Sequence, residues 1–268
     1  FIAGLHLGPA GAALGTTCAQ AISVVISLCM IIRQRKEFSF SRKDFRLSHN
    51  IMGQILKIGI PIALQDGFIQ VAFMIITIIA NQRGLNDAAA VGIVEKIISF
   101  LFLIPSSMLS TVSALGAQNI GAGKRQRANE TLRYAVMITA GFGIIVGIFM
   151  QFFASPVVAL FTDASDASGA EVVRLGGPYL RGYVWDCMFA GIHFSFSGYF
   201  CACGKSGISF LHNIIAITLV RIPGVYLTST LFPDTLFPMG LATAAGSLLS
   251  AIICVVAFTI LNRKERQK

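Results

Sequence analysis

Residues 131–153 read TLRYAVMITAGFGIIVGIFMQFF, and this stretch holds no charged residue after Arg133. About 20 helical residues are needed to cross the hydrocarbon core of a bilayer, so the stretch is long enough for a transmembrane helix. Similar stretches occur at 10–32, 54–80, 88–117, 178–202, 206–231 and 237–261. The sequence therefore predicts an all-α integral membrane protein with seven transmembrane helices.

The composition of the 268-residue chain agrees with this prediction. Apolar residues (AVILMFWYC) make up 55% and charged residues 12%, against about 25% charged residues in soluble domains. The mean hydropathy is +0.75. These values exclude a soluble enzyme and a disordered chain. The net charge of +9 does not indicate nucleic-acid binding, because the basic residues cluster between apolar stretches, as in proteins that span a lipid bilayer.

The charges of the loops predict an orientation and a domain organisation. Basic residues gather in the segments that lie on one side of the membrane if the helices alternate, and the opposite loops are mainly acidic. The positive-inside rule then places linker 33–50, loop 118–130 and the C-terminus in the cytoplasm of a multi-pass plasma-membrane protein. We expect four regions: the last helix of a first lobe at 1–32, a basic linker at 33–53, a six-helix lobe at 54–261 and a basic tail at 262–268.

The motifs of common enzyme classes are missing from this sequence. Gly204-Lys205-Ser206 resembles the end of a phosphate-binding loop, but Tyr199 stands where that loop needs its first glycine. Cys201 and Cys203 have no nearby histidine or second thiol pair, so they predict no metal site. We therefore expect a protein that is not an enzyme and that needs no metal or cofactor.

Polar residues within three predicted helices form narrow stripes. At about 100° per residue, each set falls on one face of its helix, and ionisable residues at membrane depth usually mark functional sites. The stripes predict one water-accessible cavity shared by the three helices. The candidate substrate- and cation-binding residues are Asp66, Gln70, Thr77, Glu95, Asp186, His193 and Ser197.

Other polar positions have structural explanations that remain open. Asp186 and Arg221 lie at similar depth, so Arg221 forms either a neutralising pair with Asp186 or part of a substrate contact. Pro61 and Pro223 are expected to bend their helices. His212 lies outside the stripes and is expected to be structural. Asp66, near mid-span, is expected to be the main coupling charge.

Four segments resemble those of a known family. Lys57-Ile58-Gly59-Ile60-Pro61-Ile62-Ala63-Leu64 resembles the start of the seventh helix of multidrug and toxic compound extrusion (MATE) transporters. Gly116-Ala117-Gln118-Asn119-Ile120-Gly121-Ala122-Gly123 looks like the loop after their eighth helix. Val220-Arg221-Ile222-Pro223 looks like part of their eleventh helix, and Gly8-Pro9-Ala10-Gly11-Ala12-Ala13-Leu14 resembles the start of their sixth.

The resemblance implies a transporter of twelve helices in two six-helix lobes, which exports cationic or amphiphilic drugs in exchange for H+ or Na+. This chain would hold the sixth helix, the linker and the second lobe, and its partner would be the missing N-terminal lobe. Family members that couple through the second lobe use acids in their seventh and tenth helices. Gln70 and Ala190 stand nearest those positions, with Asp66 and Asp186 one turn earlier.

Two alternatives remain open at this stage. A flippase for lipid-linked saccharides, in the same superfamily, would favour a cationic groove, whereas the predicted cavity has three acids and one arginine. The second alternative, from a different class, is a receptor or channel module that does not transport. A channel would need a continuous polar pore through a symmetric oligomer. The predicted stripes converge within one chain, which favours the exporter.

Overall fold

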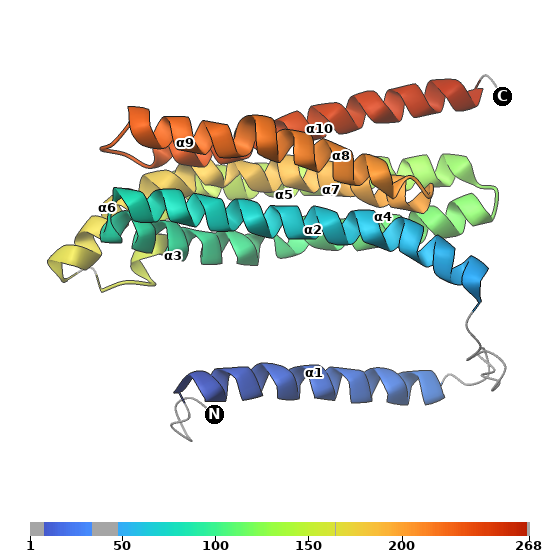
Figure 1. Cartoon of the computed structure of the whole chain (residues 1–268), viewed down its shortest axis with the longest axis horizontal. Helices are drawn as coiled ribbons and strands as arrows, with labels where there is room; N and C mark the ends of the chain where they lie inside the picture. Colours follow the sequence, from blue (N-terminus) through green and yellow to red (C-terminus); the bar gives the residue numbers. More distant parts are fainter. Residues whose placement is uncertain (1–7, 34–47, 164, 267–268) are drawn as a thin grey trace. The chain divides into compact units, whose positions relative to one another are not determined.

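The computed structural model describes residues 8–33, 48–163 and 165–266, and all regular structure in these ranges is helical (Figure 1). Residues 34–47 of the predicted basic linker and residues 267–268 of the tail lie outside the described residues. The chain divides into two compact units, Phe1–Met52 and Gly53–Lys268. The helices are α1 (Gly8–Arg33), α2 (His49–Arg83), α3 (Leu85–Leu101), α4 (Leu103–Gly121), α5 (Arg125–Ala159), α6 (Ala167–Tyr183), α7 (Trp185–Ala202), α8 (Ser206–Ala216), the π-helix η2 (Ile217–Arg221), α9 (Ile222–Leu231) and α10 (Phe237–Arg266).

Within the described residues, six helical segments are long and apolar enough to cross a membrane. They are Ala13–Arg33, His49–Arg83, Leu85–Gly121, Arg125–Ala159, Ser206–Leu231 and Phe237–Arg263. Six of the seven predicted stretches correspond to these segments, so the chain is a multi-pass all-α membrane protein.

The remaining predicted stretch, 178–202, is not one continuous helix. The structure divides it at Val184, between the end of α6 and the whole of α7. Many α7 side chains are buried, including the polar Asp186, His193 and Ser197. Because α7 is surrounded by other helices, its surface contacts protein and needs less apolar character than a helix that faces lipid.

Proline explains one of the breaks in the other spans. Pro105 has no N–H to donate to the carbonyl of Leu101, and the helix is interrupted at Phe102, between α3 and α4. The predicted bend at Pro223 falls where η2 precedes α9. Pro61, by contrast, lies inside the unbroken α2.

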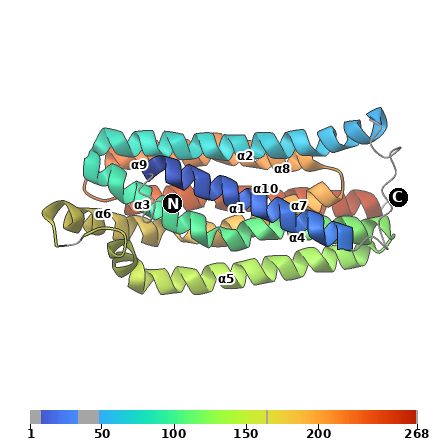
Figure 2. The ribbon, with the colours of Figure 1, turned by 90° about the horizontal axis from the view of Figure 1, so that it is seen from below.

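Helix α7 occupies the centre of the second unit, with α4, α5, α8 and α10 around it, and α6 packs against α3, α5 and α10 (Figures 1 and 2). Small residues permit these close crossings. A Cβ on Gly143 of α5 would lie 2.4 Å from the Cα of Met188, and one on Gly198 of α7 would lie 2.5 Å from the Leu109 carbonyl oxygen. The helix backbones are therefore in direct contact at these glycines.

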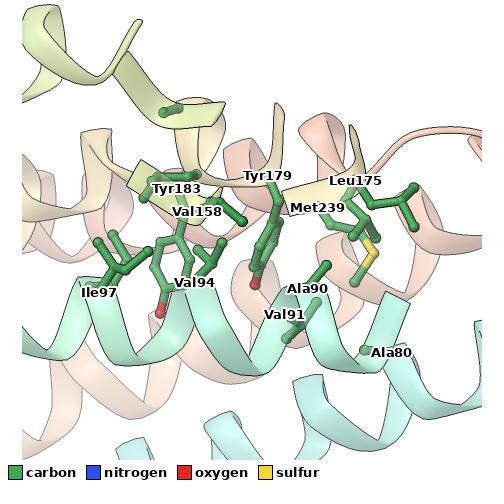
Figure 3. Packing of buried hydrophobic residues seen from close by; sticks show 14 of the residues in the cluster. Ala80, Ala90, Val91, Val94, Ile97, Val158, Leu175, Tyr179, Tyr183 and Met239 are labelled. Carbon is green, nitrogen blue, oxygen red and sulfur yellow. The ribbon is translucent and has the colours of Figure 1, made fainter. Parts of the chain in front are cut away.

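The described residues form two buried apolar clusters, one around α3 and α6 and one where α4, α5, α7 and α10 meet. Val91 and Val94 of α3 pack against Tyr179 and Tyr183 of α6, and all four side chains are fully buried (Figure 3). In contrast, α5 presents large apolar side chains such as Ile145 outward. An apolar outer surface of this kind is suited to lipid.

Candidate substrate and cation site

An open cleft of about 440 Å³ lies between α2 and α3. Its lining residues are Gln70, Phe73, Met74, Thr77, Ile78 and Glu95. The Thr77 hydroxyl donates to the Phe73 carbonyl oxygen at 2.9 Å. Glu95 is half-buried, and its Oε1 atom has no hydrogen-bond partner. The cleft therefore combines apolar walls with one half-buried carboxylate, whose Oε1 atom is buried without a hydrogen-bond partner.

A buried ion pair lies behind the wall of this cleft. Nη2 of Arg221 donates to Oδ2 of Asp186 at 3.2 Å and to the Tyr183 hydroxyl oxygen at 3.0 Å. Asp186 is fully buried, and the Arg221 side chain is 9% exposed. The sequence leaves two roles open for Arg221, an ion pair with Asp186 or a substrate contact. The structure supports the ion pair.

Phe73 connects the cleft with the ion pair. Its ring lines the cleft, and the Arg221 guanidinium carbon lies 5.4 Å from the ring centroid. The guanidinium is also 5.9 Å from the centroid of Tyr183. Two aromatic faces stabilise a desolvated cation through their quadrupoles. A molecule in the cleft would therefore lie against the ring that also supports Arg221.

A third polar group lies around two histidines, apart from the residues of the cleft. The Ser197 hydroxyl is 2.9 Å from Nε2 of His212, and the Ser250 hydroxyl is 2.6 Å from its Nδ1. The His193 ring lies 5.5 Å from the His212 ring, and its Nδ1 has no partner. His212 therefore joins α7, α8 and α10 through two side-chain hydrogen bonds.

The predicted site residues thus fall into three places instead of one shared cavity. Gln70, Thr77 and Glu95 line the cleft, whereas the residues of the α7 stripe are buried inside the lobe. Asp66 belongs to neither group: it is exposed on α2, and it is not one of the residues that line the cleft. The helix that carries Glu95 ends at Leu101 and does not continue unbroken through the predicted stretch 88–117.

Two buried polar residues, Gln65 and Ser250, were missed by the sequence reasoning. Gln65 is 1% exposed, and neither atom of its amide has a partner. Its spacing with the buried Ala72, Ile76 and Ile79 marks the packed face of α2, and this spacing could have found it. For Ser250, which lies in a stretch rich in small residues, no sequence signal indicated a partner on α8.

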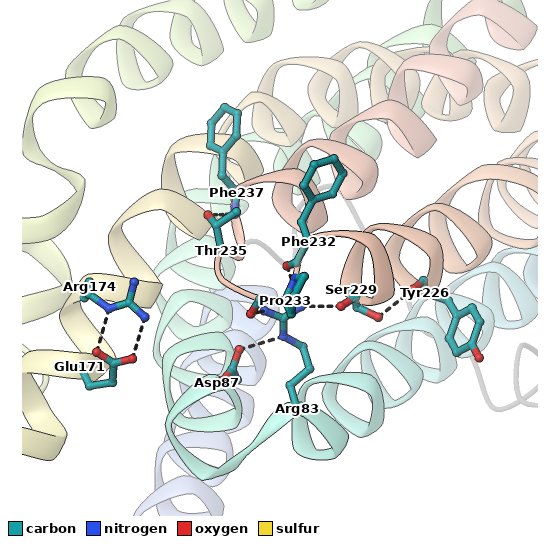
Figure 4. Close-up of polar contacts among 10 residues, drawn as sticks. All are labelled: Arg83, Asp87, Glu171, Arg174, Tyr226, Ser229, Phe232, Pro233, Thr235 and Phe237. Carbon is teal, nitrogen blue, oxygen red and sulfur yellow. Dashed lines mark hydrogen bonds and ion pairs between the residues drawn. The ribbon is translucent and has the colours of Figure 1, made fainter.

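Arg83, at the end of α2, contacts the end of α9 and the loop that follows it (Figure 4). Its Nη1 donates to the carbonyl oxygens of Ser229 and Phe232, its Nη2 to that of Pro233, and its Nε to Asp87 at 2.8 Å. The last carbonyls of a helix lack intrahelical partners and favour a cation. Arg83 therefore holds the end of α9 and the following loop against α2.

A second ion pair near the same end is exposed to solvent. Arg174 contacts Glu171 through two hydrogen bonds of 2.7 and 2.8 Å (Figure 4). This contact lowers the pKa of Glu171 below its ordinary value and raises the pKa of Arg174. Exposed pairs add little to stability, so this pair serves as a control for Arg83.

Residues 61–227, from Pro61 in α2 to Leu227 in α9, match the sequence profile of the MatE family. The chain belongs to the MatE family. Like other MatE proteins with solved structures, it has an all-helical membrane fold, and the family consists of transporters, not enzymes.

Two curated relatives are bacterial proteins, one described as a probable multidrug resistance protein and one as a multidrug export protein. The probable multidrug resistance protein YpnP of Bacillus subtilis is 27% identical over 85% of this chain and 50% of its own length. The multidrug export protein MepA of Staphylococcus haemolyticus is 26% identical over 98% of this chain and 56% of its own length. The chain thus spans about half the length of the curated relatives it matches.

Solved MatE structures share the fold at low sequence identity. A MATE protein crystallised in complex with MaL6 superposes with a TM-score of 0.89 and 19% identity, covering all of this chain and 60% of that one. A point mutant of the Vibrio cholerae MATE transporter VcmN gives a TM-score of 0.85, also at 19% identity, over 98% of this chain and 58% of that one. These likenesses establish the fold.

Proposed function

We propose that this chain forms part of a secondary active multidrug exporter, which exchanges cationic or amphiphilic compounds for H+ or Na+. Its relatives are described as multidrug export or resistance proteins. Alternating access requires two lobes that move around a site at their interface. The activity therefore belongs to a full-length protein that contains this sequence together with an N-terminal lobe.

The observation that carries this proposal is the lining of the cleft between α2 and α3. Phe73, Met74 and Ile78 offer apolar and aromatic contact, and Glu95 offers a carboxylate with an unpaired oxygen. An amphiphilic cation fits these groups, because its apolar part contacts the side chains and its charge pairs with Glu95.

Coupling follows if the ion and the drug compete for the same carboxylate. A proton or Na+ on Glu95 removes the charge that would hold the drug, so the two ligands exclude one another. Asp186 is less suited to this role, since Arg221 already neutralises it inside the lobe. Asp66, exposed on α2, is the remaining candidate among these acids.

Ion-driven efflux of a cationic dye from proteoliposomes of the full-length protein tests the proposal. We expect Glu95→Gln to abolish most efflux and to weaken dye binding, because the amide cannot pair with the cation. Glu130→Gln, at the exposed N-terminal part of α5, is the matched control. Normal efflux by Glu95→Gln combined with loss in Asp66→Asn would move the coupling charge to Asp66. Normal efflux by both variants would contradict coupling through this lobe.

A saccharide-lipid flippase is the alternative within the superfamily. Such a substrate carries phosphate groups and calls for basic side chains. The residues that line the cleft include one acid and no base, which favours the exporter.

We also propose that linker 33–50, loop 118–130 and the C-terminus face the cytoplasm of a cell that carries the protein in its plasma membrane. The basic residues near α5, such as Lys124 and Arg127, support this orientation. In a cysteine-free background, a cysteine at Gln126 should react only with membrane-permeant reagents, whereas one at Ser165 should react with impermeant ones. The reverse labelling would refute the orientation.

A further inference from the structure

A small cavity lies inside the lobe where α8 and η2 meet α10. Its volume is about 10 Å³, which is close to the space needed for one water molecule. Every lining residue is buried. The lining residues are Asn213, Ala216, Ile217, Arg221, Gly246, Ser247 and Ser250.

Two lining residues carry buried hydrogen-bond donors that have no partner. These donors are Nδ2 of Asn213 and Nε of Arg221, and both residues are more than nine-tenths buried. Leaving such a group unpaired costs the protein the full desolvation penalty of that group. The cavity also contains two hydroxyl groups, from Ser247 and Ser250, whose oxygens can accept hydrogen bonds.

The backbone keeps this cavity from closing. Arg221 ends the π-helix η2, and single-turn π-helices are frequent at functional sites. A Cβ on Gly246 would lie 2.8 Å from the Cβ of Arg221. Because α10 has no side chain at Gly246, the stem of Arg221 lies against the α10 backbone, and no side chain at that position fills the space beside it.

We propose that one water molecule occupies this cavity as a permanent part of the lobe. It accepts hydrogen bonds from Nδ2 of Asn213 and Nε of Arg221, and it donates to the hydroxyl oxygens of Ser247 and Ser250. All four bonding positions of the water are then used. Two donors disfavour a cation.

The water connects the two buried polar groups of the lobe. On one side, Arg221 pairs with Asp186. On the other, Ser250 contacts His212, which in turn contacts Ser197. An unbroken series of hydrogen bonds then runs from Asp186, in the first turn of α7, to Ser197, about three turns further along the same helix.

A structure of the chain in lipid nanodiscs, at a resolution that shows ordered water, tests the proposal directly. We expect one density peak within hydrogen-bond distance of Nδ2 of Asn213 and Nε of Arg221. An empty cavity would overturn the proposal. A peak that gains anomalous signal when chloride is replaced by bromide would also overturn it, because that signal identifies a halide.

Variants provide a second measurement. Ser247→Ala deletes one of the proposed acceptors, and Ser195→Ala deletes an equally buried hydroxyl that does not line the cavity and that bonds the Gly191 carbonyl. Asn213→Leu keeps the volume and removes a donor. We expect Asn213→Leu to displace the water and to lower the unfolding midpoint by about 2–4 °C more than Ser195→Ala. A water peak retained in Asn213→Leu would contradict the assigned partners.

Discussion

Removing the positive charge of Arg221 gives the sharpest test of how this lobe is held together. In Arg221→Met the carboxylate of Asp186 stays fully buried without its partner. At 3.2 Å and an effective dielectric constant of about 20, the attraction that is lost amounts to about 5 kcal/mol. Breaking one side of a buried ion pair typically costs about 3–5 kcal/mol. For a domain of this size, that cost corresponds to a fall of about 6–20 °C in the unfolding midpoint.

The double variant separates charge from packing. Asp186→Asn combined with Arg221→Met removes both charges, so neither ion is left uncompensated inside the lobe. Replacing a buried pair by neutral side chains is often far less costly than breaking it. We therefore expect the double variant to be at least about 2 kcal/mol more stable than the sum of the two single effects predicts.

Trp185 fluorescence can report the unfolding of the wild type, the two single variants and the double variant. Trp185 is the one tryptophan of the sequence, and it precedes Asp186 directly. Its ring would be 3.0 Å from a Cβ on Gly147, so it reports on the contact between α5 and α7. Thermal unfolding in detergent followed by Trp185 fluorescence gives the four midpoints, with Arg174→Met as the exposed control. Arg221→Met as stable as the wild type, or strictly additive effects, would refute the reasoning.

Three further changes address other parts of the lobe. Gly143→Ala should lower stability by about 1–3 kcal/mol, because its Cβ would lie 2.4 Å from the Met188 Cα. Gly141→Ala is the control, because the space around Gly141 is open. Thermal unfolding should show a lower midpoint for Gly143→Ala only. His212→Phe should lower the free energy of unfolding by about 1–3 kcal/mol, because the hydroxyls of Ser197 and Ser250 lose their ring partner. His49→Phe, at the exposed start of α2, is the control. Equal unfolding midpoints of the two variants would contradict the role of His212. Arg83→Gln should speed amide hydrogen exchange in residues 229–236, because the carbonyl oxygens of Ser229, Phe232 and Pro233 lose their guanidinium contacts. Arg174→Gln should leave that exchange unchanged, and a similar effect of both changes would show that Arg83 has no special role.

The membrane-spanning architecture of this protein follows from its sequence. Because a bilayer requires about 20 apolar residues per helix, stretches such as 131–153 predict their spans without knowledge of their neighbours. The same reasoning identified stretch 178–202 as helical, but it did not show that the stretch divides at Val184 or that α7 lies at the centre of the second unit. Hydropathy identifies an apolar helix, but it does not show whether that helix faces lipid or other helices.

Which polar groups meet was decided by the tertiary structure. Gln65 and Asp66 are neighbours in the sequence, but a rotation of about 100° buries the first and leaves the second exposed. Sequence periodicity identifies a polar face, but the rotation and axial shift of each helix determine what that face contacts. The sequence therefore placed Asp186 and Arg221 at similar depth, whereas the packing of α7 against α10, with η2 beside α10, brought their atoms within 3.2 Å. The pairing of His212 with Ser250 likewise depends on the register between α8 and α10, because contacts between distant segments are set by side-chain packing along the whole interface.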